Sequence, residues 1–215
     1  MAAADQLVAK AAEEALAAQE PAQEPAQEPA QEPDDEDPEV VDGPEEECVY
    51  FYGHSKKTDP YRVFSNFFPA QFTMQLDAVG QPARTETYAT SEHAIMHQKA
   101  VLFGDEVRAE LIQHPWSAPA TAKKLGRKVS PYDEAVWAER RGEVALAILR
   151  AKFDQNEPLG AALRATAPRT LAEAAPADRV WGIGRTAAAA RGGAPWRGEN
   201  LLGTTLMVVR DEMGA

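Results

Sequence analysis

The chain has 215 residues, of which 44% are hydrophobic, enough for one domain of ordinary size together with an appendage. Its net charge of −12 is unevenly spread, because residues 1–47 hold 16 acidic side chains against one basic, whereas the rest hold 21 basic against 18 acidic. A charge of +3 on the C-terminal part provides no basic stripe for DNA, although it suits a phosphate-bearing ligand.

The composition also limits where in the cell the protein can reside. Cys48 is the single cysteine, which excludes an internal disulfide and a cysteine-based zinc site and suits a reducing compartment. No apolar run approaches the ~18 residues of a membrane span, and the N-terminus has the pattern of neither a secretory signal nor a mitochondrial presequence. We therefore expect an intracellular protein, cytoplasmic with the nucleus left open, that contacts no membrane.

Residues 1–47 form the first segment. The tetrapeptide Ala-Gln-Glu-Pro is repeated four times from Ala18 to Pro33, and an acidic run follows. A proline at every fourth position prevents helix and strand pairing, and the regularly spaced glutamates repel one another. We expect a disordered acidic tail, which serves either as a solvated tether or as a contact surface for basic partners. Residues 48–215 are then the folded domain.

Two strands are expected at the start of this domain. The runs 49–52 and 72–76 are rich in aromatic and apolar residues, and the second alternates apolar with polar positions. Between them, Ser65 and Asn66 form a predicted turn flanked by aromatic residues. The residue types leave open whether this turn is only structural or takes part in binding.

The segment 90–103 is predicted to be a helix with a conflict on its apolar side. When it is wound at about 100° per residue, Glu92 and Lys99 fall on the same stripe as Ile95 and Leu102. A carboxylate and an ammonium on an apolar face cost several kcal/mol per ion unless they pair or border a wet cavity. The two residues are therefore either a structural ion pair or part of a catalytic site.

Further elements follow in order. Helices are expected at 106–113 and 119–125, from Ser130 onward, and at 158–165 and 200–213, with a third strand at 170–174. Gly126 is expected to end the second of these helices, Ser130 to cap the longest, and Asn200 to cap the last. Along the longest helix, Trp137 and Lys152 can share a face.

The segment from Asp178 to Gly184 leads into a loop rich in glycine, alanine and arginine that lasts to Glu199, longer than a compact domain needs for a connection. Its guanidinium and backbone N–H groups suit a phosphate, and Trp181 before it could stack on a nucleobase; a solvated loop is the plain alternative. His93 and His97 have the spacing of a metal-binding pair, but the chain supplies no third ligand at useful spacing. We therefore expect no metal and no cofactor.

Several short motifs, taken in order, resemble one family. They are Ser65-Asn66-Phe67, Ser91-Glu92-His93 with Lys99-Ala100, Ala122-Lys123-Lys124-Leu125-Gly126-Arg127, Trp137, Lys152-Phe153, Leu171-Ala172-Glu173-Ala174, Asp178 with Trp181-Gly182, and Asn200-Leu201-Leu202-Gly203 with Leu206-Met207 and Arg210. The ordered set resembles the NADAR family, which includes riboflavin-biosynthesis-intermediate N-glycosidases and ADP-ribosyl-guanine hydrolases. The likeness extends from about Val49 to Arg210.

The resemblance implies a compact, mostly helical α+β domain with a small β-sheet. It implies cleavage of an N-glycosidic bond between ribose and a base-like amine, in a small nucleotide-like substrate or in ADP-ribosylated nucleic acid. Glu92 is then the essential acid, with Lys99 as its partner. The implied substrate-binding residues are Ser65, Asn66, Phe67, Trp137, Lys152, Trp181, Gly182 and Asn200. Residues 94–96 depart from the family's usual aromatic and amide residues, which leaves the base selectivity open.

The chemistry of this reaction fits the conflict in the helix. Cleaving the bond develops positive charge on the sugar, which Glu92 can stabilise while it deprotonates the attacking water. The leaving base needs a proton, for which Asp178 and Lys99 are the candidates. In a second route, Lys99 or Lys152 attacks the anomeric carbon and forms a Schiff base. Two other classes stay open: a non-catalytic module that binds ADP-ribose or a related nucleotide, and a scaffold whose acidic tail recruits basic partners.

Overall fold

Four short strands and seven α-helices make up the part of the chain that the structure describes. The computed structural model describes residues 47–76 and 84–214. The strands are β1 (Cys48–Phe51), β2 (Phe72–Leu76), β3 (Arg84–Tyr88) and β4 (Thr170–Glu173). The helices are the 3-10 helix η1 (Pro60–Phe64), α2 (Ser91–Leu102), α3 (Glu106–Gln113), α4 (Pro119–Gly126), α5 (Glu134–Asp154), α6 (Glu157–Arg164), α7 (Ala187–Arg191) and α8 (Leu201–Met213).

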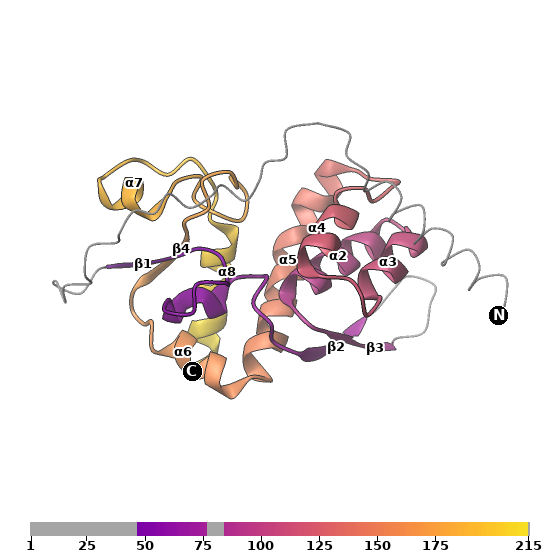
Figure 1. The fold of residues 1–215 in the computed structure, drawn as a ribbon, viewed down its shortest axis with the longest axis horizontal. Coiled ribbons are helices and arrows are strands. Elements are labelled where there is room, and N and C mark those ends of the chain that lie inside the picture. Colours follow the sequence, from indigo (N-terminus) through magenta and orange to yellow (C-terminus); the bar gives the residue numbers. More distant parts are fainter. Residues whose placement is uncertain (1–46, 77–83, 215) are drawn as a thin grey trace. The chain divides into compact units, whose positions relative to one another are not determined.

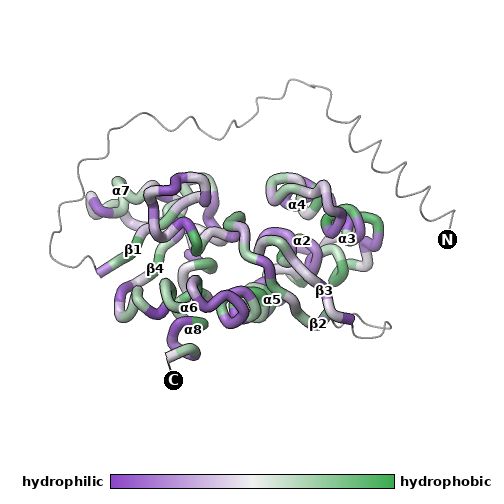
Figure 2. Tube along the Cα trace, turned by 60° about the horizontal axis from the view of Figure 1, so that its bottom comes forward, coloured by the Kyte–Doolittle hydropathy of each residue, from purple (hydrophilic) through white to green (hydrophobic). Residues whose placement is uncertain are grey.

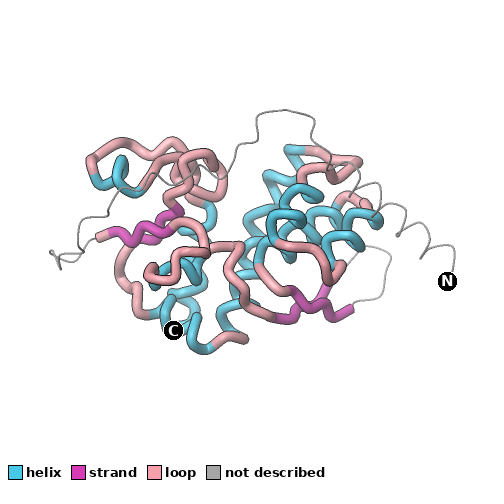
Figure 3. The backbone as a smooth tube through the Cα atoms, viewed as in Figure 1, coloured by secondary structure: helices cyan, strands magenta, loops and turns pink. Residues whose placement is uncertain are grey.

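Helices predominate in this part of the chain (Figure 3), which confirms the predicted α+β class. Helix α7 interrupts the long loop predicted before α8. The predicted acidic tail lies outside the described residues except for its last residue, Glu47. No helix between residues 47 and 214, with the gap at 77–83 set aside, is long and apolar enough to cross a membrane.

The strands form two separate pairs. β1 lies parallel to β4, with Val49 opposite Leu171, so the start of the described chain joins a segment far along the sequence. β2 and β3 are antiparallel, with Phe72 opposite Tyr88. The sequence did not predict β3, because Tyr88 is the only buried residue among its five and no apolar alternation marks the strand.

One hydrophobic core cluster in the described part of the chain is built by β1, β4, η1, α5, α6 and α8. Phe64 of η1 meets Phe51 of β1 edge to face, with ring centroids 5.6 Å apart. The face that α8 presents to this core consists of Leu202, Leu206 and Val209. Gly203 allows α8 to lie close against β4, because a Cβ there would be 2.2 Å from the Leu171 carbonyl oxygen.

Helix α2 lies between α3, α4 and α5, as both ribbon and tube views show (Figures 1 and 2). Its residues 91–97 are all buried, so enclosure on several sides, rather than one apolar stripe, takes Glu92 out of water. The predicted stripe is wrong at its C-terminal end, where Leu102 is 40% exposed. Gly126 of α4 makes the close packing possible, because a Cβ there would lie 2.0 Å from the Met96 sulfur.

Three predicted helix ends differ from the structure. Gly126 lies inside α4 rather than after it, and Arg127 is the C-cap residue. α5 begins at Glu134, because Asp133 replaces Ser130 as the cap and accepts hydrogen bonds from the amides two and three residues on, at 2.8 and 3.2 Å. Asn200 precedes α8, but its side chain makes no capping bond and turns to β4 instead.

Candidate active site

Glu92 lies in the first turn of α2, where two hydrogen bonds fix the local backbone. The Thr90 hydroxyl caps the helix by accepting from the His93 amide, and the Glu92 amide donates to the Asn66 carbonyl at 2.9 Å. The Glu92 residue is 4% exposed, and among the described residues its Oε1 atom has no hydrogen-bond partner. A buried carboxylate oxygen without a partner indicates a place for a ligand or water.

The charges around Glu92 come from outside its own helix. Burial raises the pKa of Glu92 to about 7, while Lys123 of α4 and Arg127, the residue that follows α4, lower it and Asp178 raises it. Lys99 is not among these charged neighbours. The predicted partnership of Glu92 and Lys99 is therefore not an ion pair in the structure.

A second carboxyl group, that of Glu173 at the end of β4, lies near Glu92, Asp178 and Lys123; these four residues are called the carboxyl cluster below. Its Oε2 atom is buried and, in the described part of the chain, has no hydrogen-bond partner. Burial raises the pKa of Glu173 to about 8; Asp178 and Glu92 raise it further, while Lys123 lowers it. Two carboxyl groups that share these neighbours are the pattern of an acid and base pair.

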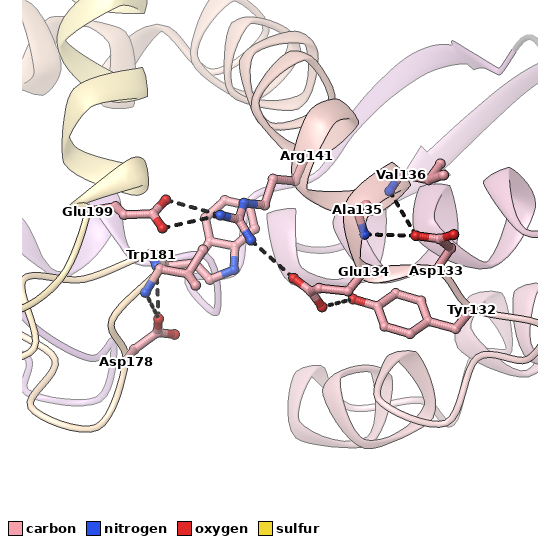
Figure 4. A network of polar contacts seen from close by, with 10 residues as sticks. Tyr132, Asp133, Glu134, Ala135, Val136, Arg141, Asp178, Trp181 and Glu199 are labelled. Carbon is pink, nitrogen blue, oxygen red and sulfur yellow. Dashed lines mark hydrogen bonds and ion pairs between the residues drawn. The ribbon is translucent and has the colours of Figure 1, made fainter.

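Asp178 lies in the tight turn after β4. Its Oδ1 atom accepts hydrogen bonds from the Val180 amide at 3.0 Å and from the Trp181 amide at 2.8 Å. Figure 4 shows Asp178 below Trp181. Gly182 is required in this turn, because a Cβ there would lie 2.9 Å from the Glu173 carbonyl oxygen. The turn therefore places Asp178 beside Glu173, with one carboxylate oxygen committed to the backbone.

Figure 4 also shows Arg141 of α5 between two glutamates. It pairs with Glu199, just before α8, at 3.1 Å and with Glu134, at the start of α5, at 3.6 Å. These pairs tie the long loop before α8 to the first turn of α5.

Lys152 holds the predicted turn at Ser65 and Asn66 in place through hydrogen bonds to the turn's backbone. Its ammonium donates to the carbonyls of Val63 and Ser65, at 3.0 and 3.1 Å, and the residue is fully buried. Burial lowers the pKa of Lys152 to about 7. Because the Asn66 carbonyl in turn accepts from the Glu92 amide, Lys152 supports the start of α2 through this loop.

The same loop also contacts Lys123 of the carboxyl cluster through Phe67. Phe67 lies under the Lys123 ammonium, 5.6 Å from the ring centroid, and the Asn66 Oδ1 atom is buried without a described partner. Lys123 thus contacts the loop while its charge acts on Glu92 and Glu173.

The Lys99 side chain, from α2, packs against two aromatic residues near the start of α5. Its ammonium lies over the Tyr132 ring, 4.0 Å from the centroid, and 5.8 Å from the centroid of buried Trp137. Burial lowers the pKa of Lys99, and Glu134 opposes that change.

Asn200 uses its side chain to join two elements of the fold. Its Oδ1 accepts from the Glu173 amide at 3.0 Å, and its Nδ2 donates to the Leu171 carbonyl at 2.8 Å. The residue adopts the left-handed conformation, with φ of 55°. Asn200 therefore positions the backbone of Glu173.

His93 and His97 are both satisfied within the protein. His93 contacts the Thr90 hydroxyl and the Ser117 carbonyl, each at 2.8 Å, and His97 contacts the Tyr88 hydroxyl at 2.8 Å. Burial lowers the pKa of His97 to about 4. Within residues 47–76 and 84–214, no group of three possible metal ligands comes together.

The structure thus brings together Glu92, Asn66, Phe67 and Asp178 of the predicted residues and adds Glu173 and Lys123. The two additions lie in motifs that carry the family resemblance, so their position in the sequence was a usable signal. A cleft of about 860 Å³ elsewhere, lined by residues such as Gln98 and Glu110, does not include Glu92.

Comparison with known families gives a clear result. The sequence profile of the NADAR domain matches residues 50–214. The chain belongs to the NADAR family. N-glycosidase R617 of Acanthamoeba polyphaga mimivirus is 34% identical over 166 residues, which cover 76% of this chain and 95% of that protein.

Two further relatives extend the NADAR comparison. N-glycosidase YbiA of Escherichia coli is 34% identical over 165 residues, covering 77% of this chain and 88% of YbiA. The solution structure of E. coli YbiA has a TM-score of 0.57 and 33% identity, over 78% of this chain and 84% of the other. Riboflavin biosynthesis protein VVA0006 of Vibrio vulnificus is 30% identical over 78% of this chain and 39% of that protein.

Proposed function

We propose that this protein hydrolyses the N-glycosidic bond between ribose, carried as ribose phosphate or ADP-ribose, and a base-like amine. The observation that carries the proposal is the buried Glu92 carboxyl, with an unpartnered oxygen, beside Glu173, Asp178 and Lys123. The relatives named as N-glycosidases support the reaction class.

Glu92 suits the central role in such a reaction. Loss of the base leaves positive charge on the ribose ring, and a carboxylate in a dry site interacts with that charge more strongly than one in water. With a pKa of about 7, Glu92 is ionised in slightly alkaline solution and can also accept a proton from the attacking water. Its place in the first turn of α2 adds the favourable end of the helix dipole.

The basic residues of α4 suit a phosphate-bearing substrate. Lys123 and Arg127 both act on Glu92, and Lys124 and Lys128 are exposed nearby in the sequence. A phosphate or diphosphate held there would bring the ribose toward the carboxyl groups. We propose two substrate classes: an early intermediate of riboflavin synthesis, suggested by the name of the Vibrio relative, and ADP-ribosylated guanine.

The lysine route stays testable for Lys99. Burial favours its neutral amine, the form that attacks an anomeric carbon, whereas Lys152 is enclosed behind the Ser65 loop. Treatment with borohydride during turnover should trap a covalent adduct if a lysine attacks. Unmodified protein, by mass, would favour direct attack by water.

A substrate panel tests the proposal. The full-length protein is incubated separately with ribosylated riboflavin precursors, with guanine ADP-ribosylated in an oligonucleotide, and with free damaged nucleotides, and released base is measured by mass. We expect one class to release free base. Binding of ADP-ribose by calorimetry without release from any class would instead indicate a non-catalytic module.

A further inference from the structure

We propose that Glu173 donates the proton to the leaving base and works as a pair with Glu92. This inference rests on the proposed N-glycosidase function and assigns its missing acid. The sequence offered Asp178 and Lys99 for that role. In the structure, one Asp178 oxygen accepts two backbone N–H bonds, and the Lys99 ammonium lies over the Tyr132 ring.

The backbone of Glu173 is held firmly in place. Its amide donates to the Asn200 side chain at 3.0 Å, and its carbonyl accepts from the amides of Ala175 and Ile183, both at 2.9 Å. The side chain ends in an Oε2 atom that is buried and has no partner among the described residues. A rigid backbone with an uncommitted acid group is the arrangement that a directed proton transfer needs.

The two glutamates have different charged neighbours, and this difference decides which of them holds the proton. Glu92 faces two cations, Lys123 of α4 and Arg127 just after it, and one acid, Asp178. Glu173 faces one of those cations, Lys123, together with two acids, Asp178 and Glu92. Glu92 therefore ionises first, and its charge then helps to keep Glu173 protonated.

The pKa values agree with this geometry. Burial raises the pKa of both groups; Lys123 and Arg127 lower that of Glu92, whereas Asp178 and Glu92 raise that of Glu173 further, so when the pair holds one proton, Glu173 holds it. An ionised base and a protonated acid are then present together. This is the state that hydrolysis of an N-glycoside requires at its start.

The step balances in atoms and charge. The C–N bond breaks, its electron pair goes to the leaving nitrogen, and that nitrogen takes the proton from Glu173. The oxygen of water bonds to the anomeric carbon and gives a proton to Glu92. The products are the neutral base and the ribose phosphate or ADP-ribose with a hydroxyl on its anomeric carbon, and transfer of a proton through solvent from Glu92 to Glu173 restores the starting state.

The test compares two ribose phosphate N-glycosides that the wild-type protein cleaves, one with a neutral heterocycle as leaving group and one with an N-methylated, cationic heterocycle. A cationic group leaves as a neutral molecule without taking a proton. We expect Glu173→Gln to lower kcat about 100-fold or more on the neutral substrate and less than about 5-fold on the cationic one. Glu92→Gln should impair both substrates.

The pH profile gives a second readout. On the neutral substrate, the wild-type rate should fall as pH rises above about 8, and Glu173→Gln should lose that alkaline limb. Circular dichroism and thermal unfolding identify a misfolded variant, and Glu139→Gln, at an exposed position of α5, is the matched control.

Equal losses on both substrates, or an unchanged alkaline limb in Glu173→Gln, would overturn the assignment while leaving the proposed function in place. Absence of base release by the wild-type protein from every substrate would instead overturn the proposed function itself. If Glu173→Gln does not fold, Glu173→Asp replaces it, and the same selective loss on the neutral substrate is expected.

Discussion

Replacement of Glu92 by glutamine should stabilise the protein in alkaline solution while abolishing catalysis. The pKa of Glu92 is raised from an ordinary 4.5 to about 7, so the fold favours the protonated carboxyl. Below pH 4.5 the group is protonated in both folded and unfolded chains and no penalty exists. As pH rises from 4.5 through 7, the unfolded chain ionises freely and the folded chain does not, so stability is lost.

The size of the effect follows from the two pKa values. Each pKa unit is worth about 1.4 kcal/mol, so the difference between 4.5 and about 7 amounts to about 3 kcal/mol. Glutamine has nearly the same shape and does not ionise, so Glu92→Gln avoids this loss. For a domain of this size, about 3 kcal/mol corresponds to an increase of roughly 6 to 12 °C in Tm.

The assay is urea unfolding of the full-length wild type and variant at several pH values between 4.5 and 8.5. The difference in unfolding free energy should be near zero at pH 4.5 and grow to about 3 kcal/mol in favour of glutamine above pH 8. Glu139→Gln should show no such trend. A variant that is less stable than wild type at alkaline pH would refute the reasoning, because it would mean that the fold favours the Glu92 anion.

Three further changes follow from the same contacts. Lys123→Met removes a charge that lowers the pKa of Glu92, so the acidic limb of the pH–rate profile should move to higher pH; an unmoved limb would contradict the assigned contact. Lys152→Met leaves the Ser65 carbonyl without its donor and should reduce the unfolding free energy by about 1 to 3 kcal/mol, measured in urea; unchanged stability would count against the buried contact. Asn200→Ala breaks two bonds to β4 and should lower Tm by several degrees in a thermal scan, together with kcat; a loss of neither would show that the Glu173 backbone does not depend on it.

Local patterns in the sequence were sufficient to predict most elements. The bounds of α3 were predicted as they occur, because a helical apolar period and a following His-Pro pair mark both its length and its end. The start of α5 could not be chosen from sequence, since Ser130 and Asp133 are both good cap residues. Strand β3 carries no periodic signal, because it is held by pairing with β2 rather than by burial of one face.

Helix geometry alone pointed to only one residue of the site. A charged residue on an apolar helix face marked Glu92, but helical winding could suggest only a neighbour on the same helix, Lys99. The charges that act on Glu92 come from α4 and from the turn after β4, and only the tertiary fold brings them near. Glu173 had the further difficulty that an acid at the end of a short strand looks like an ordinary solvated residue.

The most direct test of the whole account is the release of free base by three proteins at pH 7.5: wild type, Glu92→Gln and Glu139→Gln. Each is given the substrate that the panel identifies, and the base is quantified by mass spectrometry. We predict that wild type and Glu139→Gln release base at equal rates, whereas folded Glu92→Gln releases none above the uncatalysed background. Base release by Glu92→Gln at the wild-type rate would contradict the claim that this buried carboxyl performs the reaction.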